Sequence, residues 1–256
     1  MRGAVAWVRL MHPPLNVLDI PMMGEMRLAL EEIETRADIS VVVLEGDARA
    51  FSAGVDIKAH VPELVRGMLE AFHAVIRAIV ASRKVTIACV RGACFGGGAE
   101  LALVCDIVYT ARDAAWGFPE IKLACFPPVA AVALPALVGQ KRAAELILTG
   151  RTISGDEAVA IGLANRSLVA EELDAVVAST LEELRGLSPV ALAHAKKALY
   201  GWDAIHFDKG LARAEKIYLE ELMATADARE GILAFMEKRE ARWGLQKSEV
   251  RLQKPQ

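Results

Sequence analysis

The chain has 256 residues, enough for one large domain or two small ones, and 54% of them are hydrophobic, which allows a sizeable core with or without a subunit interface. Its 30 basic and 33 acidic residues leave a net charge of −3, which supplies neither the basic surface of a nucleic-acid-binding protein nor a polybasic membrane patch. The start shows no signal-peptide pattern, and the most apolar stretch, 124–139, is short and interrupted by Pro127, Pro128 and Pro135. We therefore expect a cytoplasmic protein that has no membrane or nucleic-acid partner.

The first half of the sequence predicts alternating strands and helices. In chain order we expect a strand at 5–10, a helix at 20–36 capped by Asp19, a strand at 41–44, a loop at 50–59, a helix from Pro62 to about Ser82, and strands at 85–90 and 107–110. This alternation favours an α/β domain with parallel strand pairing. Ligands of such domains usually bind at the loops that follow the strands.

The second half is predicted to be mostly helical. Ser154 and Glu157 form a capping-box pattern, and a turn with a short strand follows at 161–168. Further helices are expected at 170–187, 188–199, 207–224 and 227–243, before a polar tail at 244–256. We interpret this part as a helical element appended to the mixed core.

The stretch 91–120 holds the residues with the clearest chemical potential. A small-residue turn, 92–98, ends in three consecutive glycines, and Glu100 and Glu120 flank an apolar run at 101–109. A buried carboxyl group has a raised pKa, which suits it to exchanging protons near neutrality. The pair could instead be a helix N-terminal acid and a surface acid, and the glycine turn could serve tight packing alone.

A second loop of small residues contains Ala53 and Gly54. Together with the glycine turn it could present free backbone N–H groups that stabilise a developing oxyanion. An ordinary strand-to-helix turn is the alternative interpretation.

Other common site patterns are absent from the sequence. Its histidines lack metal-ligand spacing, although His60 follows the second loop and could reach a pocket, whereas His73 is interpreted as structural. Cys94 paired with a histidine is a conceivable nucleophile without an orienting pattern. No GxGxxG follows a strand and no GxxxxGK[ST] occurs, which disfavours dinucleotide and nucleoside-triphosphate sites. The cysteines are predicted to be buried free thiols at Cys89, Cys94, Cys105 and Cys125.

Five segments in a fixed order carry a family resemblance. They are FSAGVDIK (51–58), RGACFGGGAELALVCDIVYT (91–110), WGFPEIKL (116–123), GRTISGDEAVAIGLAN (150–165) and DAREGILAFMEKR (227–239). In this order and spacing they resemble the crotonase (enoyl-CoA hydratase/isomerase) superfamily, over nearly the whole chain.

The resemblance implies an α/β spiral of repeated ββα units. On this basis residues 1–187 would form the spiral core and 188–256 a helical region that builds trimers, often paired into hexamers. The substrate would be an acyl-CoA thioester, so coenzyme A would be part of the substrate, and the reaction would need no separate cofactor and no metal.

The resemblance also implies roles for individual residues. Glu100 and Glu120 would be the catalytic pair, with Glu120 as the acid that exchanges a proton with carbon and Glu100 activating water, although the two roles could be exchanged. The thioester oxygen would accept hydrogen bonds from the N–H groups of Ala53 and Gly97. The residues implied to bind coenzyme A are Ala53, Val55, Asp56, Ile57, Lys58 and Lys238.

Two departures from the family pattern concern the start of the chain and the acyl pocket. The sequence begins near the family's second strand, and 124–130 replaces a glycine-rich segment that lines the acyl pocket. This replacement, with 60–63 and 218–223, is similar to the cyclohexa-1,5-diene-1-carbonyl-CoA hydratases of aromatic degradation. Straight-chain hydration, Δ3–Δ2 isomerisation and a non-catalytic, for example RNA-binding, role are the alternatives. The predicted acyl pocket consists of His60, Phe126, Pro127, Pro128 and Val129.

Overall fold

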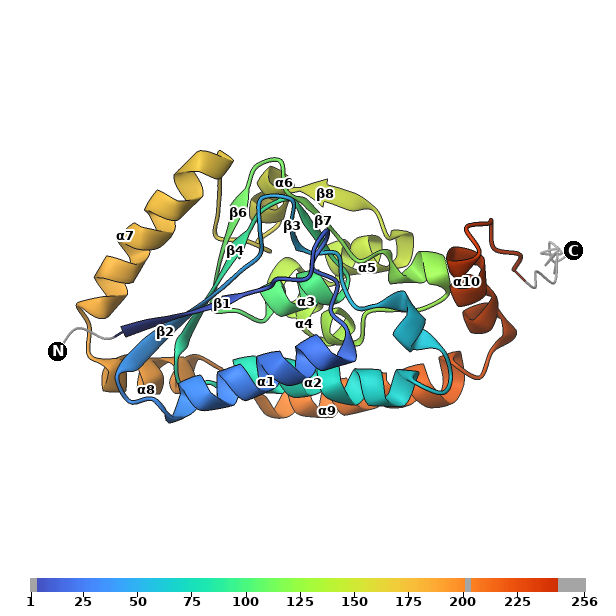
Figure 1. Cartoon of the computed structure of the whole chain (residues 1–256), viewed down its shortest axis with the longest axis horizontal. Coiled ribbons are helices and arrows are strands. Elements are labelled where there is room, and N and C mark those ends of the chain that lie inside the picture. The colour runs from blue at the N-terminus through green and yellow to red at the C-terminus, as the bar shows by residue number, and fades with distance from the viewer. Residues whose placement is uncertain (1–3, 201–203, 244–256) are drawn as a thin grey trace, which may run out of the picture.

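Two β-sheets and their covering helices make up the computed structural model, which describes residues 4–200 and 204–243 (Figure 1). The larger sheet has five parallel strands in the order β1-β2-β4-β6-β9, and the smaller has four in the order β3-β5-β7-β8, in which β8 runs antiparallel to β7. The strands outside the repeated units described next are β1 (Ala4–Arg9), β8 (Thr152–Ser154) and β9 (Arg166–Leu168).

The core repeats one unit, in which the chain contributes a strand to each sheet and then a helix. The three units are β2 (Ile39–Glu45), β3 (Ala50–Ser52) and α2 (Val65–Ala81); β4 (Val85–Val90), β5 (Ala93–Phe95) and α3 (Gly97–Leu103); and β6 (Ile107–Ala111), β7 (Ala115–Gly117) and α4 (Pro128–Val138). This is the α/β spiral of ββα units predicted from the family resemblance.

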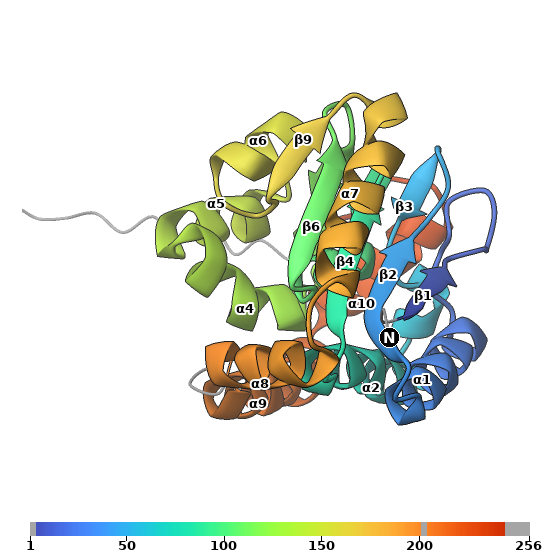
Figure 2. The ribbon, with the colours of Figure 1, turned by 90° about the vertical axis from the view of Figure 1, so that its left-hand side faces the viewer.

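The inner strands β2 and β4 of the larger sheet are mostly apolar because both faces of the sheet are covered there. Every residue of β2 and β4 is buried, as expected for strands inside a parallel sheet. Helix α7 (Leu173–Arg185) crosses one face, where it contacts β2 and β6 (Figure 2). The helices of the repeated units pack on the other side.

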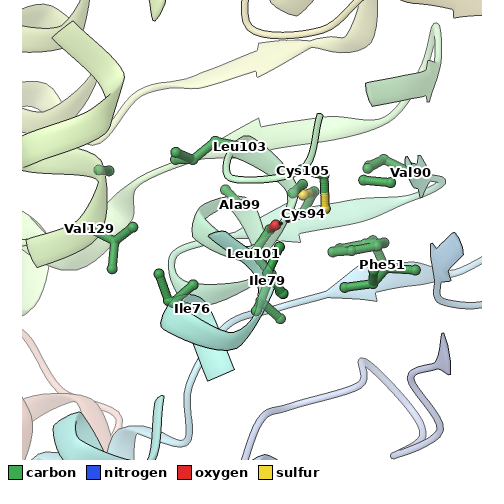
Figure 3. Close-up of a cluster of buried hydrophobic side chains, with 14 of the residues drawn as sticks. Phe51, Ile76, Ile79, Val90, Cys94, Ala99, Leu101, Leu103, Cys105 and Val129 are labelled. Atoms are coloured by element: carbon green, nitrogen blue, oxygen red, sulfur yellow. Dashed lines mark hydrogen bonds between the residues drawn. The ribbon is translucent and has the colours of Figure 1, made fainter. Parts of the chain in front are cut away.

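Helix α3 lies in the middle of the hydrophobic core. All of its residues are buried, and Ala99 and Leu101 sit among Phe51 of β3, Ile76 of α2 and Val129 of α4 (Figure 3). A helix enclosed in this way is held firmly, because each neighbouring element packs against it. Side chains at its two ends are therefore presented from a rigid support.

The C-terminal helices return along the spiral. Helix α8 (Pro189–Tyr200) contacts β2 and β4, and α9 (Ala204–Lys216) packs on α4. A π-helical segment, η4 (Ile217–Leu222), continues α9, and α10 (Ala226–Met236) packs against the short 3-10 helices η1 (Ile57–His60) and η2 (Pro119–Leu123). Helix α10 thus lies beside two of the segments that follow the short strands.

The element boundaries confirm most of the predicted order and correct some details. Asp19 caps α1 (Ile20–Thr35), where its side chain accepts a hydrogen bond from the Met22 N–H at 2.8 Å. Ser154 likewise caps α6 (Gly155–Ala160). The remaining helices are α5 (Gln140–Thr149) and η3 (Ala170–Glu172).

Several predicted boundaries were wrong. The expected loop at 50–59 contains β3 and η1, the glycine turn contains β5, α2 begins at Val65 rather than Pro62, and the last helix ends at Met236. Strands of three residues are too short to show an alternating pattern, which explains why the sequence did not reveal them. The predicted tail at 244–256 lies outside the described residues. Within the described ranges, no helix is both long and apolar enough to cross a membrane.

Candidate active site

Glu100 and Glu120 lie on two short helices that each follow a strand of the smaller sheet. Glu100 is in the first turn of α3, after β5, and Glu120 is in the first turn of η2, after β7. Because β5 and β7 are paired and parallel, both helices start at the same edge of that sheet. The two side chains consequently line one cavity of about 80 Å³.

Glycine residues allow Glu120 and the second loop to come close to the start of α3. Gly96 has a φ of 52°, and a Cβ placed there would lie only 2.6 Å from Oε1 of Glu120. A Cβ on Gly97 would lie 2.7 Å from Cγ2 of Val55. A side chain at either position would displace a wall of the cavity.

The Glu100 carboxylate is held by the N-terminal turn of α4. Its Oε1 accepts a hydrogen bond from the Ala130 N–H at 2.9 Å, and the Val129 N–H also points to this carboxylate. Burial raises the pKa of Glu100 to about 7, against these two hydrogen bonds, which lower it. The free N–H groups at a helix N-terminus favour a negative charge, so Glu100 is the better placed of the two acids to be ionised.

The carboxyl group of Glu120 has fewer hydrogen-bond partners than that of Glu100. Its Oε2 is buried and accepts no hydrogen bond from the described part of the chain, and no ion pair to either glutamate occurs there. Burial and then the charge of Glu100 raise the pKa of Glu120, which makes the protonated acid the favoured form. One cavity thus contains a carboxylate suited to accept a proton and a carboxylic acid suited to donate one.

The backbone N–H groups beside the two acids correct one predicted role. The Ala53 N–H donates to the Leu15 carbonyl at 2.9 Å, so it is not free to bind a substrate oxygen. By contrast, neither the Val55 N–H nor the Gly97 N–H donates to another described residue, and both residues line the cavity. The free pair of amides is therefore Val55 and Gly97, not Ala53 and Gly97.

The predicted acyl pocket is largely brought together. His60, Phe126, Pro127 and Pro128 line the cavity, whereas Val129 is fully buried behind it and contributes its N–H group to Glu100 instead. His60 is held by a hydrogen bond between Nδ1 and the Asp56 carbonyl at 3.1 Å. Burial lowers the pKa of His60, which favours its neutral form.

Other cavity residues were not identified as site residues from the sequence. Phe72, Met68 and Leu69 of α2 and Tyr218 of η4 also form its walls. The apolar residues of α2 follow ordinary helical spacing, which does not separate pocket residues from core residues. Tyr218 stands in the stretch 218–223 noted for its similarity to one subfamily, and that was the only signal.

The predicted coenzyme A residues lie around the cavity to different extents. Ala53, Val55 and Ile57 line it, while the Asp56 side chain caps η1 by accepting from the Lys58 N–H at 3.0 Å. The side chains of Lys58 and Lys238 are exposed. Their roles in binding coenzyme A stay predictions.

A larger cavity, of about 410 Å³, lies at the opposite end of α3. Its charged groups, Asp106 and Lys196, form an ion pair with an Nζ–Oδ2 distance of 2.7 Å, and the remaining wall is mostly apolar. Paired charges lack the free proton-exchanging groups of the smaller cavity. We therefore place the candidate active site at the N-terminal end of α3.

The cysteines and possible metal ligands do not form a second site. All four cysteines are free and buried, as predicted, and burial raises the pKa of the Cys94 thiol well above its usual value. A buried thiol of this kind is unreactive, which disfavours Cys94 as a nucleophile. Over the described ranges, no group of three or more His, Cys, Asp or Glu side chains could hold a metal ion.

Comparisons with known proteins show which proteins the chain is similar to. The sequence profile described as enoyl-CoA hydratase/isomerase matches residues 1–246. The chain is 36% identical, over 94% of its length and 93% of the relative's, to a protein of Thauera aromatica named cyclohexa-1,5-dienecarbonyl-CoA hydratase. It is 31% identical to a peroxisomal Δ(3,5)-Δ(2,4)-dienoyl-CoA isomerase of Arabidopsis thaliana, over 90% and 88% of the two chains. A crystal structure of an enoyl-CoA hydratase from Mycobacterium avium subsp. paratuberculosis K-10 superimposes with a TM-score of 0.85 at 28% identity, covering 95% and 96% of the two chains.

Proposed function

The chain belongs to the enoyl-CoA hydratase/isomerase family, and from that premise we propose that it adds water across a conjugated acyl-CoA thioester. The observation that carries the proposal is the meeting of the buried Glu100, the partly buried Glu120 and two free amide N–H groups in one cavity. The amides supply charge stabilisation, and the acids supply proton transfer in both directions.

The reaction follows from these groups. The N–H groups of Val55 and Gly97 donate hydrogen bonds to the thioester oxygen, so that negative charge can build up there as a nucleophile attacks the conjugated system. Glu100 accepts a proton from water as its oxygen bonds to one carbon. Glu120 delivers its own proton to another carbon, and the double bond between the two is saturated. Later proton exchange with solvent returns both acids to their starting forms.

We further propose that the acyl group is the cyclohexa-1,5-diene-1-carbonyl group. The relative of that name is similar over nearly the full length of both chains. The cavity supports the proposal because it is small and has rigid or aromatic walls on several sides, from Phe72, Phe126, Pro127 and Pro128. Walls of this kind suit a flat ring better than a long flexible chain.

A panel of acyl-CoA substrates tests the proposal. Purified protein should convert the cyclic dienoyl-CoA into a hydroxy-enoyl-CoA, detected by mass spectrometry as the addition of one water. Faster turnover of crotonyl-CoA would favour a straight-chain hydratase. Absence of hydration with every member of the panel would reject the proposed reaction.

Isomerisation is the second candidate function, because the similarity to the isomerase covers most of both chains. A single proton-exchanging acid suffices for moving a double bond, whereas hydration also needs a base for water. Two acids in the cavity therefore favour hydration. Conversion of a 3-enoyl-CoA into its 2-enoyl isomer without added water would favour isomerisation, and tight RNA binding without affinity for coenzyme A would favour a non-catalytic role.

We also propose that the protein acts as a homo-oligomer, a trimer or a dimer of trimers, in the cytoplasm. Exposed apolar residues on the C-terminal helices, among them Val190, Leu199 and Phe235, support an assembly role for this part of the chain. Light scattering coupled to size-exclusion chromatography measures the subunit number, and a monomer would contradict the proposal.

A further inference from the structure

Tyr218 brings a third polar group to the cavity shared by Glu100 and Glu120. Its side chain is almost completely buried and forms part of the cavity wall. Its hydroxyl group makes no hydrogen bond to the part of the chain that the structure describes, and the neighbouring Cys125 thiol is only a weak partner. A buried hydroxyl group without a hydrogen-bond partner destabilises the folded protein, so a ligand atom that forms a hydrogen bond with it would remove this penalty.

The position of the Tyr218 hydroxyl is fixed by its surroundings. The tyrosine ring packs edge-on against Phe126, with ring centroids 5.2 Å apart. One turn earlier, Glu215 accepts hydrogen bonds from His73 at 2.5 Å and Arg77 at 3.0 Å, which join α9 to α2. Tyr218 itself lies in the π-helical segment η4. Such segments are rare in proteins, and those that occur are often found at functional sites.

Two buried polar atoms without a partner therefore belong to residues that line the same cavity. One is Oη of Tyr218, which can donate a hydrogen bond, and the other is Oε2 of Glu120. Burial, together with the charges of Cys125 and the glutamates, raises the pKa of the Tyr218 phenol well above its usual value, so it stays a donor. A water molecule satisfies both atoms because it donates and accepts, whereas a hydrocarbon part of an acyl group satisfies neither.

We propose that Tyr218 holds the water molecule that is added to the acyl group, an inference that rests on the proposed hydratase function. The hydroxyl donates a hydrogen bond to the water oxygen and keeps its own proton throughout. One O–H bond of the water breaks and its proton moves to Glu100, while the water oxygen bonds to carbon and Glu120 protonates the other carbon. Tyr218 thereby fixes which lone pair of the water faces the conjugated system.

The variant Tyr218→Phe tests this role, because it removes one oxygen atom and keeps the ring that packs on Phe126. We expect kcat for hydration to fall about 10- to 100-fold, the effect of losing one hydrogen bond that orients a reactant. The Kd for the corresponding saturated acyl-CoA, which takes up no water, should change by less than about twofold. If Tyr218 had only a structural role, the substitution would lower both kcat and the affinity for the saturated acyl-CoA.

Tyr109→Phe is the matched control, because Tyr109 is a buried tyrosine whose hydroxyl bonds Thr180 at 2.9 Å outside the site. It should keep the wild-type kcat. If Tyr218→Phe also keeps the wild-type kcat, or loses kcat and acyl-CoA affinity together, the role of Tyr218 is overturned while the hydratase function stands. If the wild-type protein hydrates no acyl-CoA, the proposed function itself is overturned.

Discussion

The two ends of helix α3 bury carboxylate groups in opposite ways. At the C-terminal end, Asp106 pairs with Lys196 at 2.7 Å and accepts hydrogen bonds from the Thr86 N–H at 2.7 Å and hydroxyl at 2.9 Å. At the N-terminal end, Glu100 and Glu120 share a cavity without a cation, and one oxygen of Glu120 has no partner among the described residues. The same fold thus contains one acid that is paired with a cation and two neighbouring acids that are not.

The contrast shows that unpaired acids are not a requirement of this fold. Pairing a buried carboxylate satisfies it, but it also fixes its ionised form and removes it from proton exchange. Leaving two carboxyl groups unpaired raises their pKa values and keeps proton transfer available. The acids at the N-terminal end of α3 therefore lower the stability of the fold but remain available for proton transfer, whereas the paired acid at the C-terminal end does not.

Removing the ionisable carboxyl group of either unpaired acid should have the largest effect. Glu100→Gln and Glu120→Gln keep the shape of the side chain but abolish proton exchange, so each should lower kcat for hydration by about 10²–10⁴-fold. Steady-state kinetics measures this, with Glu171→Gln in the exposed turn η3 as the control. Near-normal rates in both active-site variants would reject their assigned roles.

Breaking the paired end should affect stability instead. Lys196→Met leaves Asp106 buried without its cation, which should lower the free energy of unfolding by about 3–5 kcal/mol. Urea denaturation measures this loss, and the folded variant should keep its kcat because the pair lies outside the active site. The neighbouring exposed lysine gives the control Lys197→Met, which should be nearly neutral. If Lys196→Met lost activity without losing stability, the two ends of α3 would not be independent.

Filling the space between Glu120 and the start of α3 should lower kcat by a smaller factor. Gly96→Ala places a Cβ 2.6 Å from Oε1 of Glu120 at a φ of 52°, so the carboxyl group must move. We expect kcat to fall about 10²-fold, since such a displacement misaligns a catalytic group. Gly24→Ala, in α1 with no atom near the new Cβ, is the control and should keep activity. Wild-type kcat in Gly96→Ala would show that Glu120 can act from another position.

The features that the sequence predicts well are those with local patterns. The α/β alternation follows from apolar strands such as 41–44 and 85–90, and the position of Glu100 after three glycines marks the site by motif alone. The Asp19 and Ser154 caps were also identified, because capping depends on residues only three positions apart.

The features that the sequence did not predict depend on distant contacts. The Ala53 N–H is taken by the Leu15 carbonyl, a contact between separate loops that no spacing pattern within either loop reveals. That is why Ala53 was chosen where Val55 has the free amide. Tyr218 reaches the cavity because α9 packs beside α2 and continues as a π-helical segment, which ordinary helical periodicity does not encode.

The smallest expected effect concerns the pH dependence of stability. Burial and then the charge of Glu100 raise the folded-state pKa of Glu120 above the ordinary value of 4.5. Well below pH 4.5 this acid is protonated in both the folded and the unfolded state and does not make stability depend on pH. As the pH rises above 4.5, Glu120 ionises first in the unfolded chain, which stabilises the unfolded state relative to the folded one. The free energy of unfolding therefore decreases until the pH passes the folded-state pKa of Glu120.

Glu120→Gln should remove this loss, because glutamine does not ionise. The variant should gain about 1–3 kcal/mol of unfolding free energy over the wild type between pH 5 and pH 8. Urea denaturation of both proteins at the two pH values measures the difference, and taking the difference cancels groups whose pKa values are lowered, such as Glu34 and Glu230. The same experiment with Lys196→Met should show no such gain, because the paired end keeps Glu120 unchanged. A gap between wild type and Glu120→Gln that stays constant with pH would mean that Glu120 ionises as readily in the folded protein as in the unfolded chain, and the contrast between the two ends of α3 would be lost.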